Sequence, residues 1–547
     1  MLVSIFNDVI GPVMRGPSSS HCAAALRIGR LARDMMSGQF INVLIEFDRG
    51  GSLPNTHDSQ GSDMGLFGGL LGWDAADERL PGSFQTFRDL GIPVSIETVD
   101  VGDPHPNTYR LTLDNEVESL SMRAISTGGG MIEVIDIDGF PVSMFGDCFE
   151  TLIWVNQDAE ALAEVISANC DVHGVTVHTN SDSGKSGQLI QVKADEFVDE
   201  VFTDSASGVQ RVKRLAPVLP VLSRKTTKVP FTTCEEMLAY DAGRGTPLWK
   251  LAIQYETSRG GLTEEEVIAK MVDIVRIIRR SIADGIAGTQ YDDRVLGHQC
   301  GRFEEKMRAG ELLDSGGSLN RIILYVTALM EVKSSMGVIV AAPTAGACAA
   351  LPGTIVAIAE TLELDERAMA KALLASGMIG VFIATRWSFA AEVGGCQAEG
   401  GSAACMAASG LVNLLDGPLN QSLAASSMAL QSMIGLICDP VANRVEVPCL
   451  GKNVMAATNA LSCANMAMSG YDPVIPLDEV IETAKQVSKQ MPRELRCTNL
   501  GGLSMTPTAI ALEKKLADGR AASCGGGCGC AAPAVASVAS IGLASKP

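Results

Sequence analysis

Apolar residues recur with two different spacings over the first 147 residues of the chain. Three short segments have the apolar spacing of strands: Phe40–Phe47, Pro93–Val99 and Tyr109–Leu113. Between the first two of them, Met64–Trp73 is an apolar run of helical character. Because strands that alternate with helices pack as layers, we predict an α/β domain over residues 1–147.

Residues 148–222 carry a second, more compact pattern. The order strand, helix, strand, strand, helix, strand is predicted for Thr151–Asn156, Ala159–Ala168, Val175–Thr179, Gln188–Ala194, Asp195–Phe202 and Val209–Pro220, with a turn at Ser181–Gly184. This order is typical of a ferredoxin-like fold and resembles ACT regulatory domains. The glycine that commonly follows the first strand of ACT domains is absent. An amino-acid-binding unit and a purely structural or dimerising unit therefore both stay open.

Helical spacing dominates residues 230–520. Glu264–Asp284 is amphipathic, whereas Ala403–Leu415 and Ser422–Leu436 are rich in Ala, Ser, Gly and Met around the whole helix. A helix without a polar face is buried on all sides, so we predict a large all-α domain with internal helices. The fold class is thus multidomain α+β. Residues 521–547 form a Cys- and Gly-rich tail without helical spacing, expected to be flexible.

Composition narrows the class of protein. The 547 residues are 46% hydrophobic and 19% charged, which excludes disorder over most of the length. A net charge of -20 argues against nucleic acid or an anionic membrane as the main partner. The first residues lack the basic start and apolar stretch of a signal peptide. Prolines, glycines and charged residues interrupt the most apolar tracts, 337–359 and 368–384, so we expect buried helices of a soluble, cytoplasmic protein.

The chain contains 15 cysteines. In a reducing compartment they serve as metal ligands, reactive thiols or small buried residues. Cys396, Cys438 and Cys449 each lie beside a Gly or Pro that breaks a helix, which leaves backbone amides free near a thiolate. They form no CxxC pair, so the spacing does not predict a tetrahedral zinc site. Core packing and an iron-sulfur cluster both stay open on the residues alone.

Several strings together resemble the iron-sulfur L-serine dehydratase family. They are MGVIVAAPTAGAC at 336–348, GCQAE at 395–399, CDPV at 438–441, VPC at 447–449, GPSSSH at 16–21, GGL at 501–503 and TPT at 506–508. The resemblance covers the family's β part at the N-terminal end and its α part in the helical region. It implies a single chain in which the two parts are fused in that order.

The resemblance also implies a cofactor and a reaction. Cys396, Cys438 and Cys449 would hold a 4Fe-4S cluster, and the iron without a protein thiolate would be an open Lewis acid. That iron would take a carboxylate oxygen and the β-hydroxyl of a small β-hydroxy acid. With L-serine, elimination of water gives aminoacrylate, whose hydrolysis yields pyruvate and ammonia. The expected enzyme is an oxygen-sensitive lyase that needs no pyridoxal phosphate.

Hydroxyl groups near the N-terminus are the predicted substrate contacts. Pro17 precedes Ser18, Ser19 and Ser20, and the apolar stretch Ala23–Ala32 follows, as at a helix N-terminus. Such an end binds carboxylates, but it is equally a simple helix cap. With the family resemblance, Ser18, Ser20 and His21 are expected to face the cluster, and all three serines are expected to bind substrate. Thr56, Asp63, Thr344 and Gly346 complete the predicted substrate-binding set.

The position of the family's candidate base differs in this chain. Gln60 stands where relatives carry a histidine, and His57 lies three residues earlier. Glutamine cannot accept a proton, so the predicted general base is His57, His21 or a residue that the sequence does not reveal. His57 as an ordinary loop residue is the alternative.

Further departures leave other functions open. Ala442-Asn443-Arg444 replaces the usual Gly-Gly after CDPV, and Arg302 lies in a second altered segment. Arginines beside the site would suit a second carboxylate, as in 2-(hydroxymethyl)glutarate, although surface positions are equally compatible. Cysteine desulfidation and a non-catalytic amino-acid sensor are further alternatives.

Two predictions concern the tail and the assembly. Cys524, Cys528 or Cys530 could occupy the open iron, bind metal adventitiously or belong to a flexible tail. A homodimer through an edge of the ACT-like unit, or a higher homo-oligomer, is the expected assembly.

Overall fold

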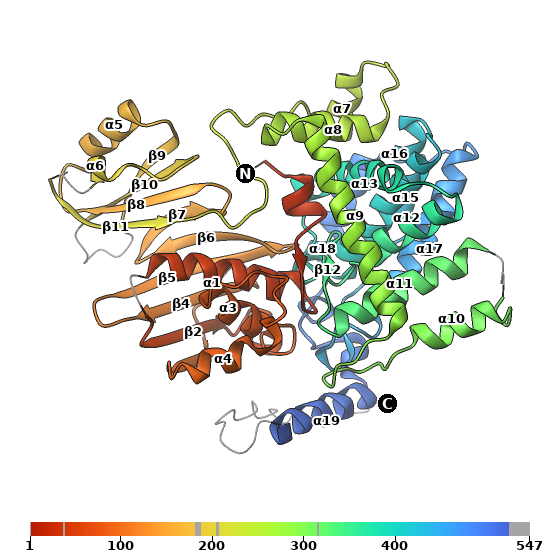
Figure 1. Ribbon diagram of the computed structural model, residues 1–547, viewed down its shortest axis with the longest axis horizontal. Helices are drawn as coiled ribbons and strands as arrows, with labels where there is room; N and C mark the ends of the chain where they lie inside the picture. The colour runs from red at the N-terminus through yellow and green to blue at the C-terminus, as the bar shows by residue number, and fades with distance from the viewer. Residues whose placement is uncertain (1, 37–38, 181–186, 204–206, 314–316, 524–547) are drawn as a thin grey trace, which may run out of the picture.

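The computed structural model describes residues 2–36, 39–180, 187–203, 207–313 and 317–523. The sheets lie in one half of the molecule and the long helices in the other (Figure 1). The protein is therefore a mixed α+β structure with a helical C-terminal region, as predicted. The Ser181–Gly184 turn and Cys524, Cys528 and Cys530 fall outside the described residues.

A six-stranded sheet of order β3-β2-β4-β5-β6-β7 forms the first part. Its strands are β2 (Asn42–Asp48), β3 (Val94–Val99), β4 (Thr108–Asp114), β5 (Ser119–Gly128), β6 (Met131–Ile137) and β7 (Phe140–Met144). Only β2 and β3 pair in parallel. Residues of β5 alternate between buried and more exposed positions, which is the pattern of a sheet with one face on a core.

Helices α1 (Ala24–Met35), α3 (Ser62–Leu70) and α4 (Ser83–Asp89) belong to the same part, and the short α2 (Leu53–Thr56) follows β2. Glycines let α1 and α3 approach closely. A Cβ atom at Gly69 would lie 2.1 Å from the Leu26 carbonyl oxygen, and one at Gly65 would lie 2.0 Å from that of Cys22. This contact fixes the loop after β2 against the segment that begins α1.

The four-stranded sheet has the order β11-β8-β10-β9 and is antiparallel throughout. Its elements are β8 (Phe149–Val155), α5 (Ala159–Asn169), β9 (Val172–Thr179), β10 (Gln188–Ala194), α6 (Glu200–Thr203) and β11 (Val209–Leu215). The predicted βαββαβ order is thus present, with a second helix shorter than expected. The ferredoxin-like and ACT-like assignment, the domain boundaries and the dimer through an edge such as β9 stay predictions.

The helical part begins at α7. Its helices are α7 (Cys234–Asp241), α8 (Leu248–Gly260), α9 (Glu264–Ala287), α10 (Cys300–Arg308), α11 (Ser318–Ser334), α12 (Ala350–Thr361), α13 (Glu366–Arg386), α14 (Ala391–Gly394), α15 (Ser402–Leu414), α16 (Leu419–Gln431), α17 (Cys449–Met468), α18 (Leu477–Gln490) and α19 (Pro507–Ser523). Every residue of α15 is buried, which confirms the internal helix predicted from its apolar composition.

Helix α13 is long and apolar enough to cross a membrane, and it is the single such helix in the described residues. Its most apolar window is 78% buried inside the protein. That burial fits a core helix, as predicted for this tract.

The first residues of the chain pack into the helical part rather than onto the six-stranded sheet. The π-helical turn η1 (Ile5–Val9) contacts α13, where a Cβ atom at Gly380 would lie 2.1 Å from Val9 Cγ1. Four residues later, β1 (Val13–Met14) pairs antiparallel with β12 (Ile339–Val340). The N-terminal segment thus ties the two parts together, a contact that the sequence pattern did not predict.

Candidate active site

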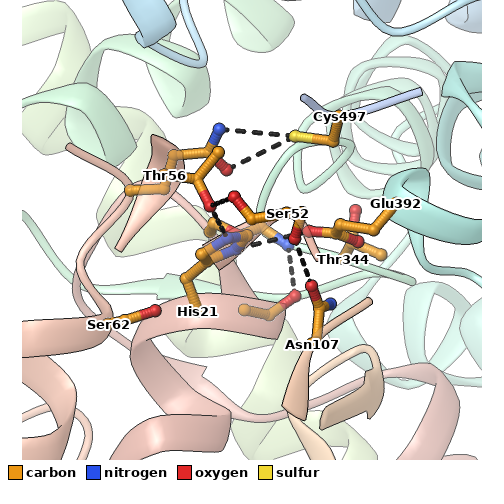
Figure 2. A network of polar contacts seen from close by, with 12 residues as sticks. His21, Ser52, Thr56, Ser62, Asn107, Thr344, Glu392 and Cys497 are labelled. Carbon is orange, nitrogen blue, oxygen red and sulfur yellow. Dashed lines mark hydrogen bonds and ion pairs between the residues drawn. The ribbon is translucent and has the colours of Figure 1, made fainter. Parts of the chain in front are cut away.

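A small cavity lies where the N-terminal part meets the helical part. Its lining comes from both: Pro17, Ser18, Gln60, Gly346, Ala391, Glu392, Glu399, Cys438, Pro440, Val445, Cys449 and Cys497. Figure 2 shows side chains of the two parts converging beside it. The GPSSSH, APTAG, CDPV and VPC strings, far apart in the sequence, therefore meet at one place.

The three cysteines predicted as ligands are buried in this region, and Cys497 joins them. Cys396, Cys438 and Cys497 belong to one buried cluster. Hydrogen bonds from Cys396 and Cys497, together with burial, raise the pKa of the Cys438 thiol well above its ordinary value. Burial, followed by the charge of Cys396, raises that of Cys449. Sequence reasoning missed Cys497, whose one signal was its place four residues before the GGL string.

Two lysines, not the predicted arginines, bring positive charge to the thiols. Lys452 Nζ lies 3.7 Å from Cys396 Sγ and 2.6 Å from Asp439 Oδ1. Lys333 is fully buried in α11 and donates a hydrogen bond to the Val445 carbonyl. Desolvation lowers its pKa, an effect that the charge of Cys449 opposes.

Arg444 does not lie in the cavity lining. Its guanidinium donates to Asp293 Oδ1 over 2.6 Å and to the Ala442 carbonyl over 3.1 Å. Arg302 lies on the exposed side of α10. The structure therefore brings neither Arg444 nor Arg302 into the cavity lining. Asp293 holds the first, and the second is exposed, which is the alternative that the sequence left open.

The donor set is compatible with an iron-sulfur cluster. Thiolates are the ligands that hold such clusters, and their negative charge needs compensation in a buried site. Four buried thiols with two ammonium groups beside them meet both requirements. No group of His, Cys, Asp and Glu within the described residues is arranged to hold a single metal ion.

His21 is held in one orientation by a hydrogen bond at each ring nitrogen. Nε2 lies 2.8 Å from Thr56 Oγ1, and that hydroxyl donates its proton to the Ser52 carbonyl. Nε2 must therefore carry the hydrogen. Nδ1 is left as an acceptor and lies 3.0 Å from Ser18 Oγ and 3.3 Å from Glu392 Oε1.

Burial shifts the pKa values of both His21 and Glu392. Desolvation, assisted by the charge of His57, lowers the pKa of His21 to about 3, so the ring is neutral near pH 7. Desolvation raises the pKa of Glu392 to about 7. A neutral imidazole whose free lone pair meets a cavity hydroxyl and a carboxyl can accept a proton, provided that the carboxylate compensates the resulting charge.

His57 lies outside the cavity lining. Its Nδ1 contacts both oxygens of Asp63, at 2.8 and 2.9 Å, and its ring packs 5.1 Å from that of Phe47. Burial lowers the pKa of His57, but the Asp63 carboxylate outweighs this and raises it above the ordinary value. The predicted residues His57 and Asp63 thus pair with each other, and the structure does not bring either into the cavity lining.

Gln60 bridges the two parts of the molecule. Its Nε2 donates to Asn443 Oδ1 over 2.9 Å and to Cys497 Sγ over 3.3 Å. Ala442 and Asn443 have φ angles of 53° and 54°, in the left-handed region that glycine adopts without strain. Here the Asn443 amide instead donates to the Asn55 carbonyl and to Ser59 Oγ.

The remaining predicted substrate contacts have distinct local roles. Ser18 stands at the N-cap position of the turn that begins at Ser19, and its side chain makes no capping hydrogen bond in the described structure. Ser19 Oγ accepts from the Ala345 amide over 3.1 Å, and Ser20 is buried beside it in the π-helical turn η2 (Ser19–Ala23). Thr344 Oγ1 donates to Glu399 Oε1 over 2.7 Å. A Cβ atom at Gly346 would lie 2.7 Å from that carboxyl oxygen, so glycine keeps Glu399 within reach of the cavity.

The fold and the cavity define a class: a two-part protein whose buried thiols, carboxyls and imidazole meet between an α/β part and a helical part. Comparison with known proteins identifies the family. Residues 243–504 match the family model described as serine dehydratase alpha chain. The chain is 37% identical over 257 residues to the probable L-serine dehydratase alpha chain of Bacillus subtilis, covering 47% of this chain and 85% of the relative.

Other relatives include both an alpha chain and a beta chain of L-serine dehydratases. The L-serine dehydratase alpha chain of Peptoniphilus asaccharolyticus is 33% identical over 50% of this chain and 94% of its own length. The probable beta chain of Bacillus subtilis is 32% identical over 39% of this chain and 97% of its own length. The chain belongs to the L-serine dehydratase family, and it is similar to both chains of two-chain relatives.

Proposed function

We propose that this protein is an iron-sulfur hydro-lyase that converts L-serine to pyruvate and ammonia. The observation that carries the proposal is the cavity in which buried cysteines from the helical part meet Ser18, and through it His21, from the α/β part. The names of the relatives support serine as the substrate.

Cys396, Cys438 and Cys449 are the residues proposed to hold a 4Fe-4S cluster. When bound, the cluster supplies a Lewis acid that turns the β-hydroxyl into a good leaving group. Lys452, within 3.7 Å of Cys396 Sγ, compensates the negative charge of the thiolates.

His21 is the proposed proton acceptor. Its Nδ1 reaches the cavity through Ser18 Oγ, which lines the cavity and can pass on the proton from the carbon next to the substrate carboxylate. Thr56 keeps Nε2 protonated and thereby keeps Nδ1 free. Glu392 Oε1, 3.3 Å from Nδ1, stabilises the imidazolium that forms. Substrate in the cavity is shielded from bulk water by the buried side chains around it.

A dicarboxylate substrate is less well supported. The arginines that motivated it are engaged by Asp293 or exposed on α10. Two carboxyl groups, Glu392 and Glu399, line the cavity instead and would repel a second substrate carboxylate.

The test is anaerobic purification followed by reconstitution with iron and sulfide. We expect about four irons per chain, a visible and EPR spectrum that changes on addition of L-serine, and formation of pyruvate. Cys438→Ser should lose the cluster. Cys405→Ser, in the all-buried helix α15, is the matched control and should keep it. A protein that binds no four-iron cluster, or a loaded protein that leaves serine unchanged, would refute the proposal.

A further inference from the structure

Glu399 is a carboxyl of the cavity lining to which the proposed function gives no role. It belongs to the π-helical turn η4 (Gln397–Gly401) of the helical part, and its side chain is half-buried. Both of its oxygens lie against Gly346, where a Cβ atom would come within 2.7 Å of Oε1 and 3.0 Å of Oε2. The absence of a side chain at Gly346 therefore makes room for this carboxyl at the cavity wall.

Thr344 orients the carboxyl. Its Oγ1 accepts a hydrogen bond from the Ala347 amide over 3.2 Å and donates its own hydrogen to Glu399 Oε1 over 2.7 Å. Since Oε1 accepts this bond, a proton on the carboxyl resides on the other oxygen, Oε2. The hydroxyl thus selects which oxygen of Glu399 carries the acidic hydrogen.

The surroundings favour the protonated form of Glu399. Burial raises its pKa, and the Thr344 hydrogen bond and the charges of Lys333 and Lys452 oppose this increase without cancelling it. The carboxyl therefore keeps its proton to a higher pH than an exposed glutamate does. A protonated carboxyl can donate to an oxygen atom in the cavity.

The other ionisable or hydrogen-bonding side chains of the lining are engaged by His21, by the proposed cluster or by each other. They are Ser18 and Glu392 beside His21, Cys438 and Cys449 as proposed ligands, and Gln60 with Cys497. Ser18, which leads to the proposed base, belongs to the α/β part, whereas Glu399 belongs to the helical part. An elimination needs a base at one carbon and an acid at the next, and the two walls of the cavity carry one of each.

We propose that Glu399 is the general acid of the reaction and donates a proton to the substrate β-hydroxyl as the carbon–oxygen bond breaks. The electron pair of the carbon–hydrogen bond forms the double bond, and its proton passes through Ser18 to His21. The electron pair of the carbon–oxygen bond leaves with the oxygen, which departs as water. His21 then releases one proton to solvent and Glu399 takes one up, which restores both groups. This inference rests on the proposed function and adds a catalytic residue to it.

The test uses a substrate whose leaving group needs no proton. β-Chloro-L-alanine carries chlorine in place of the serine hydroxyl, and chloride departs without protonation. Both compounds should yield pyruvate and ammonia with the anaerobic, cluster-loaded enzyme. Glu399→Gln, which keeps an oxygen for Thr344, should lower kcat/KM for L-serine by about 100-fold or more and for β-chloro-L-alanine by less than about fivefold.

A second measurement separates the loss of an acid from damage to the site. Glu399→Gln should still bind about four irons, and its EPR spectrum should still change on addition of L-serine. Glu150→Gln is the matched control, because Glu150 is a buried carboxyl on β8 outside the cavity lining, and it should leave both substrates unaffected.

Thr344 provides a second pair of variants, which tests the inference even if Glu399→Gln fails to fold. Thr344→Val removes the bond that orients the carboxyl and should lower kcat/KM for L-serine by about tenfold, again without a comparable effect on β-chloro-L-alanine. Thr344→Ser keeps the hydroxyl and should retain most of the wild-type activity with L-serine.

An equal loss of activity towards the two substrates, or no loss, in Glu399→Gln or in Thr344→Val would overturn the inference and leave the proposed function standing. A loaded wild-type enzyme that forms no pyruvate from L-serine would instead refute the proposed function, and the general acid with it.

Discussion

Gln60 Nε2 of the α/β part lies 3.3 Å from Cys497 Sγ of the helical part. The residue that the family resemblance puts at a histidine position therefore contacts a thiol beside the cysteines proposed to hold the cluster. A carboxamide cannot accept the substrate proton, so its contribution is structural: it joins the two walls of the cavity.

Replacing Gln60 by alanine should destabilise the protein more than it impairs proton transfer. The Asn443 and Cys497 contacts are lost in a buried site, which should cost about 1–3 kcal/mol of the free energy of unfolding. Denaturant unfolding measures this loss, and the pH dependence of kcat should keep its wild-type shape. If one limb of the pH profile of kcat were lost in this variant, Gln60 would participate in the proton transfer after all.

The two histidines should behave differently when each is changed to glutamine. His21→Gln removes the acceptor that faces Ser18 and should lower kcat by about 100-fold or more. His57→Gln, the matched control, breaks the Asp63 contact away from the cavity and should lower kcat by less than about tenfold. Steady-state pyruvate formation by the loaded enzymes measures both, and the reverse order would assign the base to His57.

The cluster-free protein should lose stability as pH rises past the titration of Glu392. Burial raises the pKa of this carboxyl from 4.5 to about 7, so the folded state holds the proton more tightly than the unfolded state. The stabilisation is complete below pH 4.5 and is lost as pH rises towards and beyond 7.

Glu392→Gln should therefore stabilise the cluster-free protein at pH 8, by up to about 3 kcal/mol, and have little effect at pH 4. Urea unfolding at the two pH values measures the difference. Glu265→Gln on the surface of α9 serves as the control and should show no gain in stability at pH 8, because Glu265 is exposed and paired with Arg367. Equal effects of Glu392→Gln at both pH values would argue against an uncharged buried carboxyl.

Asn443 offers a separate test of the contact between the two parts. Asn443→Ala removes hydrogen bonds to the Asn55 carbonyl, Ser59 and Gln60 and keeps a non-glycine residue at a φ of 54°. We expect a loss of about 2–4 kcal/mol in the free energy of unfolding. Asn443→Gly loses the same bonds but relieves the backbone, so it should be about 1 kcal/mol more stable than the alanine variant. Thermal and urea unfolding measure the pair.

Local patterns predicted many elements of the fold because they record which face of an element is buried. Gln188–Ala194 is a strand with the predicted bounds, and the amphipathic stretch that begins at Glu264 is a helix capped by Thr263. Strands β5 to β7 were not predicted. The β1–β12 pair is only two residues long on each strand, too short for a periodic signal, and joins segments about 330 residues apart in sequence.

The candidate site likewise contains residues that the sequence identified and residues that only the structure revealed. Residue types and family strings singled out Cys396, Cys438 and Cys449, and the structure brings them together in one buried region, although no sequence signal said that Cys497 would join them. Sequence reasoning also proposed both His21 and His57 as the general base and did not distinguish between them. Spatial placement distinguishes them, since His21 meets Ser18 beside the cavity and His57 meets Asp63 outside it.

The sequence by itself determined the helix and strand periods, the order of the parts and the side chains able to do the chemistry. These depend on neighbours along the chain and on residue type. Only the tertiary structure decided which groups are unpaired, which are neutralised and which share the cavity. Hydrogen-bond satisfaction and desolvation depend on residues such as Glu392 and Asn107, which lie 285 positions apart and become neighbours only in the folded protein.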